Sequence, residues 1–299
     1  MKKSVSLLLA GLMLCGALAG CGGNNNTAEN TDSQTEQTSE STGTSGAIHV
    51  VSREDGSGTR GAFVELTGVE DDNGDNTTVE AEIANRTDAV LTTVAGNEAA
   101  IGYVSLGSLN DTVKAVTVDG VEATVDNVKS GTYTLSRPFN IATKGEPTGV
   151  AEDFINFILS ADGQAIVEEE NYIKVDDAAP AFTSDGSSGQ IAVGGSSSVS
   201  PVMEKLIEAY QTVNPNAKIE LQTSDSTSGM TGAMDGTFAI GMASRELKDE
   251  EAAQLTGTAI ALDGIAVIVN TANTVENLTM DQIRSIYVGE TTDWADVAA

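Results

Sequence analysis

Short apolar runs alternate with amphipathic segments along most of the chain. The runs predict strands at 48–52, 99–104, 191–193, 218–222, 238–242 and 265–270. Apolar side chains at helical spacing predict helices at 59–66, 151–170, 201–210 and 280–287. For the third helix, Ser200 is the expected cap and Pro201 suits the first turn. Alternation of strands with helices predicts an α/β fold.

The first 21 residues have the pattern of a signal peptide. A basic start at Lys2 and Lys3 precedes an apolar stretch that is short for a membrane span. This stretch ends in Leu18-Ala19-Gly20-Cys21, which resembles the lipobox of bacterial lipoproteins. The resemblance implies cleavage before Cys21 and a lipid on its sulfur, and an ordinary secretory signal is the alternative.

Two polar stretches divide the rest of the chain. Residues 22–46 hold almost no apolar side chain and are expected to form a disordered tether. Residues 174–190 form a second such stretch and are expected to link two structured segments, 47–173 and 191–299.

The composition limits the kinds of binding site that this chain is expected to form. The net charge is −29, which excludes non-specific nucleic-acid binding and repels anions at long range. The only cysteines are Cys15 and Cys21 and the only histidine is His49, so neither a disulfide framework nor a histidine-rich metal site is expected. An anion site must therefore be built locally, from backbone N–H groups, hydroxyls and an arginine.

Three strand–helix junctions have the composition of such a site. They are 52–61, with Arg53, Ser57, Gly58 and Thr59, then 194–201, with Ser197 and Ser198, and 224–230, with Ser226. Glycines allow tight turns, hydroxyls donate hydrogen bonds, and helix N-termini attract negative charge. Ordinary loops and caps are the alternative for each junction alone. Two weaker candidates are 242–245, with Ser244, and 136–138, which could be only a turn.

Together these motifs resemble the phosphate-binding proteins of bacterial phosphate ABC transporters. The stretches that carry the resemblance are 52–60 (SREDGSGTR), 101–108 (IGYVSLGS), 131–139 (GTYTLSRPF), 241–247 (GMASREL) and 262–270 (LDGIAVIVN). The resemblance implies a two-lobed periplasmic-binding-protein-like fold of type II with phosphate in the cleft.

The resemblance also implies roles for single residues. Ser197, Ser198 and Ser226 are expected to donate from one lobe, and Arg53, Ser57, Gly58 and Thr59 from the other. Asp55 is expected to orient Arg53 through a salt bridge. Ser244 stands where some members have an aspartate that accepts a hydrogen bond from a protonated phosphate oxygen, and its absence weakens the usual argument for discrimination against sulfate.

The order of the motifs departs from the family. The segment at 52–59 usually lies midway along the domain, but here it precedes the segment at 194–198. We expect a circularly permuted chain, with one lobe made from about 191–262 and 136–173 and the other from about 263–299 and 47–135. Ala47 should then lie near Ala299, and Ser57 and Ser197 should face one cleft. A truncated tandem protein and swapped half-domains are the alternatives.

The expected function is capture of inorganic phosphate outside the cytoplasm for the permease of an ABC importer, by a lipid-anchored monomer without a cofactor. The alternatives are another tetrahedral oxyanion such as sulfate, or a sensor or interaction lipoprotein that has lost binding. Enzymatic hydrolysis through Ser57 or Ser197 is not expected, because neither serine has a paired base near it in sequence.

Overall fold

The computed structural model describes residues 44–297. The predicted signal peptide, Cys21 and the predicted tether up to residue 43 lie outside the described residues, as does Ala299. In the described part, residues 44–46 contact the folded domain. The hydroxyl of Thr274 lies 2.6 Å from the Thr44 backbone nitrogen, and the Gly46 carbonyl accepts a hydrogen bond from Trp294.

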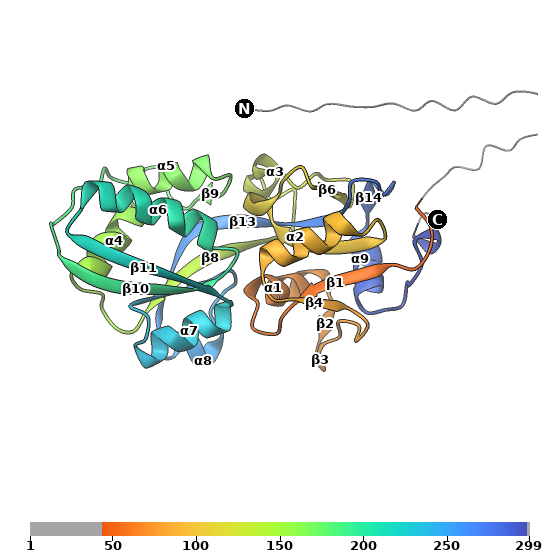
Figure 1. The fold of residues 1–299 in the computed structure, drawn as a ribbon, viewed down its shortest axis with the longest axis horizontal. Coiled ribbons are helices and arrows are strands. Elements are labelled where there is room, and N and C mark those ends of the chain that lie inside the picture. The colour runs from red at the N-terminus through yellow and green to blue at the C-terminus, as the bar shows by residue number, and fades with distance from the viewer. Residues whose placement is uncertain (1–43, 298–299) are drawn as a thin grey trace, which may run out of the picture. The chain divides into compact units, whose positions relative to one another are not determined.

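Residues 44–297 form two α/β lobes that share one long mixed sheet (Figure 1). The strand order is β11-β10-β12-β8-β13-β5-β1-β4. The fold class predicted from the sequence, α/β and two-lobed, is therefore confirmed.

The first lobe contains the elements between residues 49 and 129, the end of β13 and the elements between residues 277 and 296. Its strands and helices are β1 (His49–Arg53), α1 (Gly58–Thr67), β4 (Glu82–Ala84), α2 (Thr87–Gly96), β5 (Ala100–Ser105), β6 (Val113–Ala115), α3 (Val125–Lys129) and α9 (Met280–Tyr287). Shorter pieces are β2 (Glu70–Asp71), β3 (Gly74–Asp75), η1 (Leu106–Ser108), β7 (Thr117–Val118), β14 (Asn277–Leu278) and η2 (Trp294–Asp296).

The second lobe contains the elements between residues 136 and 256. They are β8 (Ser136–Thr143), α4 (Val150–Ile158), α5 (Ala161–Glu169), β9 (Ile173–Lys174), β10 (Gly189–Ser196), α6 (Ser200–Val213), β11 (Ala217–Ser224), α7 (Ser226–Asp235), β12 (Ile240–Ala243) and α8 (Asp249–Ala252). The strand β13 (Thr256–Asn270) begins in this lobe.

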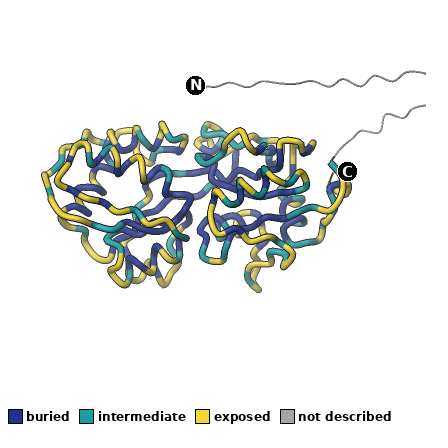
Figure 2. Tube along the Cα trace, viewed as in Figure 1, coloured by how far each residue is buried: buried dark blue, intermediate teal, exposed yellow. Residues whose placement is uncertain are grey.

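The lobes are joined where β8 and β13 meet. β13 pairs antiparallel with β8 from Thr256 to Gly264, and then with β5 from Ile265 to Val269. A single strand thus runs through both lobes, and its buried course is visible between them (Figure 2).

Each lobe has its own apolar core. One core gathers side chains from 50–135 and 265–297, with Ile173, around the stacked rings of Phe63 and Tyr103. The other gathers side chains from 139–172 and 193–261. Neither lobe is contiguous in sequence, and this division matches the two lobes expected from the motifs.

The two ends of the described chain lie side by side. Ala47 forms an antiparallel bridge with Asp293, and the Ile48 nitrogen donates to the Thr292 carbonyl at 2.8 Å. The segment that ends the chain therefore runs next to the segment that begins the first lobe.

The predicted helix at 151–170 is wrong as one element, because it divides into α4 and α5. Ser160 caps α5: its hydroxyl accepts from the Gly163 nitrogen at 3.2 Å and donates to the Phe157 carbonyl at 2.6 Å. The prediction that Ser200 caps α6 is also wrong. Val199 is the N-cap, and Ser200 instead contacts the hydroxyl of Thr223 at 2.8 Å.

The connection between β9 and β10 is held against the second lobe. Phe182 packs its ring edge-on against Phe157. The buried carboxylate of Asp153 accepts hydrogen bonds from the Ser184 hydroxyl at 2.7 Å and the Asp185 nitrogen at 3.0 Å. The predicted 174–190 linker thus lacks long elements but is anchored by specific contacts.

Candidate anion-binding site

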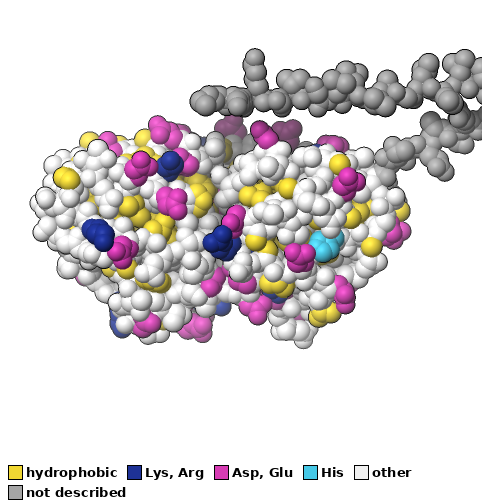
Figure 3. Space-filling view, viewed as in Figure 1, with side chains coloured by type: hydrophobic (Ala, Val, Ile, Leu, Met, Phe, Trp, Pro, Cys, Tyr) yellow, Lys and Arg dark blue, Asp and Glu magenta, His cyan; other side chains and the backbone are white. Residues whose placement is uncertain are grey.

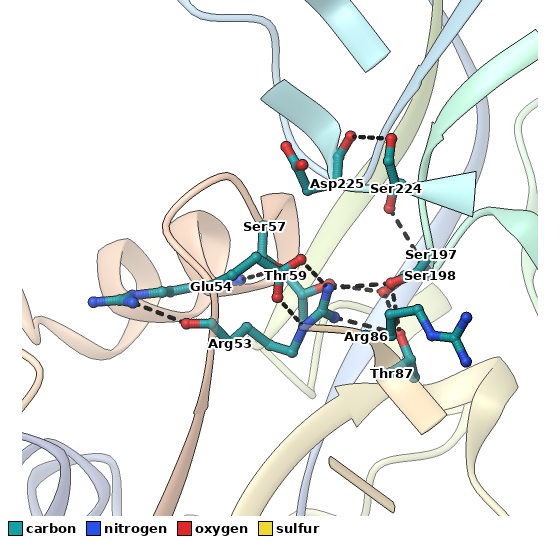
Figure 4. A network of polar contacts seen from close by, with 12 residues as sticks. Arg53, Glu54, Ser57, Thr59, Arg86, Thr87, Ser197, Ser198, Ser224 and Asp225 are labelled. Carbon is teal, nitrogen blue, oxygen red and sulfur yellow. Dashed lines mark hydrogen bonds and ion pairs between the residues drawn. The ribbon is translucent and has the colours of Figure 1, made fainter. Parts of the chain in front are cut away.

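A cluster of buried hydroxyls lies where the two lobes meet (Figure 4). Thr59 and Thr87 come from the first lobe, and Ser197, Ser198 and Ser244 come from the second. The Thr59 hydroxyl lies 2.9 Å from that of Ser198 and 3.3 Å from that of Ser244. The Thr87 hydroxyl lies 3.3 Å from that of Ser197 and 3.2 Å from that of Ser198. All five side chains are at most 8% exposed.

The hydroxyl cluster lies at the N-terminal ends of four helices. Thr59 is in the first turn of α1, Thr87 opens α2, Ser197 and Ser198 precede α6, and Ser226 opens α7. Helix N-termini present unpaired N–H groups and the positive end of the helix dipole. The cluster therefore combines hydroxyl donors with four favourable dipoles, an arrangement that suits an anion.

Arg53 extends this donor set from the end of β1. The residue is 2% exposed, and its guanidinium donates to the Ser197 hydroxyl at 3.1 Å and to the Thr87 hydroxyl at 3.3 Å. Glu54 holds the other edge of the guanidinium with two hydrogen bonds of 2.8 Å.

The prediction that Asp55 orients Arg53 is wrong. Asp55 points to solvent, with its side chain 97% exposed, and pairs with Arg60 at 2.9 Å. The chain turns after β1, so the adjacent Glu54 faces the guanidinium and the carboxylate two residues on does not.

Two glycines of the first lobe allow the close approach of the second lobe. A Cβ on Gly58 would lie 2.3 Å from the Ser226 Oγ and 2.9 Å from the Ser244 Oγ, and one on Gly56 would lie 2.3 Å from an Asp225 carboxylate oxygen. The Thr227 nitrogen donates to the Gly56 carbonyl at 3.1 Å. Larger residues at these positions would hold the lobes apart.

The structure brings most of the predicted site residues together, but not all in the same role. Arg53, Thr59, Ser197, Ser198 and Ser244 share one hydrogen-bonded cluster. Ser226 contacts the backbone of this cluster, because its hydroxyl accepts from the Ser244 nitrogen at 3.1 Å. Ser57 is buried as the N-cap of α1 and accepts from the Arg60 nitrogen at 3.3 Å.

Three residues that contact the cluster were not among the binding residues predicted from the sequence. Thr87 is a single threonine at a helix start, a signal shared by most caps. Ser196 donates to the Ser244 hydroxyl at 3.0 Å and lies beside the serines that were selected. Arg137, which lies in the weaker candidate 136–138, donates to the Thr59 hydroxyl at 3.1 Å from the start of β8.

The cluster favours negative charge although the protein surface does not. Acidic side chains are scattered over both lobes on the face shown in Figure 3, where few basic ones are visible. Glu54 is held by Arg53, and Asp263 is held by Arg137 at 3.1 Å. Within the cluster, the groups that face one another across the lobes are hydroxyls and arginine N–H donors, which suit an anionic acceptor.

A cavity of about 380 Å³ adjoins the cluster. Ser197 and Thr87 form its wall toward the cluster, and Arg86, Asp88, Pro201 and Glu204 lie around it. Within residues 44–297, no group of three or more acidic, histidine or cysteine side chains is arranged to hold a metal ion. No helix in this range is long and apolar enough to cross a membrane.

Two α/β lobes joined by crossover strands, with donors from both lobes meeting in the cleft, define a two-lobed solute-binding protein. The family model described as "PBP superfamily domain" matches residues 17–162 and 180–299. The chain therefore belongs to the PBP superfamily and, by the relatives below, to its PstS phosphate-binding family.

Relatives along the full length are similar to this chain. It is 48% identical over 304 residues to "Phosphate-binding protein PstS 2" of Streptococcus agalactiae serotype V, covering 99% of this chain and 98% of the relative. It is 44% identical over 297 residues to the protein of that name from Streptococcus pneumoniae serotype 4, covering 98% of both.

A solved structure agrees with the fold. A phosphate-binding protein of a phosphate ABC transporter from Streptococcus pneumoniae TIGR4 superposes with a TM-score of 0.69 at 46% identity. The match covers 84% of this chain and all of that one.

Proposed function

We propose that the protein captures inorganic phosphate outside the cytoplasm and delivers it to the permease of an ABC importer. The observation that carries this proposal is the buried cluster in which Arg53, Thr59 and Thr87 of one lobe meet Ser197, Ser198 and Ser244 of the other. The relatives named as phosphate-binding proteins support phosphate as the anion.

The chemistry of binding follows from the donor set. Phosphate oxygens accept hydrogen bonds from the hydroxyls, the helix N-termini and the Arg53 guanidinium, which binds oxyanions well because its donors form a planar fork. Since the donors come from both lobes, phosphate favours the closed arrangement over an open one. No bond is made or broken, and the permease recognises the closed protein.

We propose that the anchor is a lipid on Cys21. Its support is the lipobox-like sequence before Cys21 and the polar stretch that follows it. A polar tether of about 25 residues has a mean reach of roughly 25–30 Å, which suits a domain working just above a membrane. A Cys21→Ser variant should lose membrane association, and unchanged recovery in the membrane fraction would refute the anchor.

We propose that the chain order is a natural circular permutation within a monomer. The discontinuous lobes, the bridge between Ala47 and Asp293 and the anchored 174–190 connection support it. The full-length matches to PstS 2 proteins count against a gene-model artefact, because those relatives share the same order. A monomer in sedimentation, binding one phosphate, is expected; a dimer that binds one phosphate between two chains would contradict the proposal.

Phosphate uptake tests the transport function. In cells whose only phosphate-binding protein is this chain, radiolabelled phosphate uptake should depend on it and fall strongly with Arg53→Met. A Lys218→Met variant, at an exposed position on β11, is the matched control and should leave uptake unchanged. Normal uptake without the protein would overturn the proposal.

A further inference from the structure

Beside the hydroxyl cluster, the junction of the lobes contains a second set of buried polar side chains. Within residues 44–297, every buried side-chain nitrogen or oxygen that lacks a hydrogen-bond partner belongs to four residues. The atoms are Nε and Nη1 of Arg137, Oγ of Ser108, the hydroxyl oxygen of Tyr172, and Oδ2 of Asp263, which has an ion pair with Arg137 but no hydrogen bond. Native proteins pair nearly all such groups, so a gathering of unpaired ones points to a partner that binds there.

These residues meet at the crossover strands. Arg137 at the start of β8 and Asp263 in β13 are direct partners in the sheet, and the Arg137 Nη2 lies 3.1 Å from the Asp263 Oδ2. The Ser105 hydroxyl donates to the other oxygen of Asp263 at 3.0 Å. Tyr172 packs so closely on Gly107 that a Cβ there would lie 2.6 Å from the tyrosine hydroxyl.

Arg137 reaches from this junction into the hydroxyl cluster. Its Nη2 donates to the Thr59 hydroxyl at 3.1 Å, and Thr59 in turn contacts Ser198 and Ser244. The Arg137 side chain is 2% exposed. The cluster is thus bordered by two buried arginines, Arg53 at the end of β1 and Arg137 at the start of β8.

Another buried arginine in the same protein shows what a structural pair looks like. Arg245 makes hydrogen bonds of 2.7 and 2.8 Å with the two oxygens of Glu251. Arg137 has one contact with Asp263 and keeps two nitrogens without a partner. An arginine that served only to neutralise Asp263 would donate two parallel hydrogen bonds to its carboxylate.

We infer that Arg137 is a second arginine of the anion site, positioned by Asp263, and that its unpaired N–H groups bind an oxygen of the phosphate. The inference rests on the proposed function and deepens it. Arg137 lies on β8, which pairs with β13 where the lobes are joined, so its bond to the ligand is made at the connection between the lobes. It also adds N–H donors to those of Arg53, whose guanidinium already makes two hydrogen bonds with Glu54.

The test is calorimetric titration of phosphate into wild-type protein, Arg137→Met, and the double variant Arg137→Met/Asp263→Asn. The single variant leaves a buried carboxylate unpaired and is expected to fold poorly. The double variant removes both charges and should fold, as judged by circular dichroism and melting temperature. Its phosphate affinity should fall about 10- to 100-fold, the range for hydrogen bonds to a charged group.

The matched control is Lys114→Met/Glu276→Gln, which removes a 2.6 Å ion pair of the first lobe between β6 and the residue before β14. Its phosphate affinity should stay within about twofold of wild type. A folded Arg137→Met/Asp263→Asn variant that binds phosphate as tightly as wild type overturns the inference while the proposed function stands. Wild-type protein that binds no phosphate overturns both.

Discussion

The hydroxyl oxygens of Thr59 and Ser198 lie 2.9 Å apart, although 139 positions separate the two residues in the chain. Thr59 belongs to α1 of the first lobe, and Ser198 precedes α6 of the second. A ligand that binds both residues therefore binds both lobes.

Removal of either hydroxyl should weaken phosphate binding without unfolding the protein. Thr59→Val and Ser198→Ala each remove one donor to a charged ligand, which costs about 1.5–3 kcal/mol, or roughly a 10- to 150-fold rise in Kd. Equilibrium binding measures the effect. Ser130→Ala, at an exposed serine beyond α3, is the control and should bind like wild type. An unchanged Kd in both site variants would show that these hydroxyls do not bind phosphate.

Gly58→Ala should obstruct the closed form. Its Cβ would lie 2.3 Å from the Ser226 Oγ, and overpacking of this kind costs about 1–3 kcal/mol. Because the contact exists only when the lobes meet, phosphate affinity should fall roughly 5- to 100-fold while the melting temperature of the ligand-free protein changes little.

Two further variants sharpen the test of Gly58. In the same helix, a Cβ on Gly61 has its nearest neighbour at 3.7 Å, so Gly61→Ala should bind phosphate normally. Adding Ser226→Ala to Gly58→Ala removes the closest clashing atom and should recover part of the affinity. A Gly58→Ala protein with wild-type affinity would show that the lobes need not approach this closely.

The buried carboxyl of Asp263 should give stability an unusual pH dependence. Burial raises the pKa of Asp263 to about 6, even though the charge of Arg137 and the hydroxyl of Ser105 favour the ionised form. In the unfolded chain an aspartate titrates near pH 3.9. The folded protein therefore binds this proton more tightly, and the stability from this group is lost as pH rises from about 4 through 6.

The Asp263→Asn variant isolates this contribution, because wild type and variant have all other carboxyl groups in common. The free energy of unfolding of wild type minus that of the variant should decrease between pH 4 and pH 7, by at most about 3 kcal/mol. Urea unfolding at several pH values measures it. A difference that stays constant or grows with pH would contradict the raised pKa.

Asp153 should hold the connection between β9 and β10 in place. Its carboxylate also accepts hydrogen bonds from the Tyr210 hydroxyl at 2.8 Å and the Asn214 amide at 3.3 Å. Asp153→Ala leaves these buried donors without an acceptor and should lower stability by about 3 kcal/mol.

The same variant should expose residues 175–188 to proteolysis but leave the Kd for phosphate unchanged in the folded protein. Asp176→Ala, which removes only an exposed turn contact, is the control. Cleavage at the same rate in wild type and Asp153→Ala would show that the connection is held by other contacts, such as those of Phe182.

Local patterns predicted the strand–helix junctions, because a run of glycine and serine after an apolar strand indicates a tight turn followed by a helix start. The sites at Arg53, Thr59, Ser197, Ser198 and Ser244 follow from such runs. Thr87 could not be selected in this way, since a lone threonine at a helix start is common and only the tertiary fold brings it to Ser198.

Other differences arise from long-range pairing. Arg137 precedes a proline and suggests a turn, but pairing of β8 with β13 makes this stretch a buried crossover strand. The carboxylate that holds Arg53 depends on how the chain turns after β1, which the residues at 54 and 55 do not reveal. The break between α4 and α5 depends on Ser160 acting as a cap inside an otherwise continuous apolar pattern.

The central claim is that one phosphate is bound by donors from both lobes of one chain. Calorimetric titration of phosphate into wild type, Arg53→Met and Ser198→Ala, with sulfate as competitor, tests it most directly. The account predicts one site per chain in wild type and weaker binding when either lobe is altered. Because Ser244 offers a hydroxyl rather than a carboxylate, sulfate should compete measurably. Binding of half a phosphate per chain, or loss of affinity from changes in one lobe only, would contradict the account.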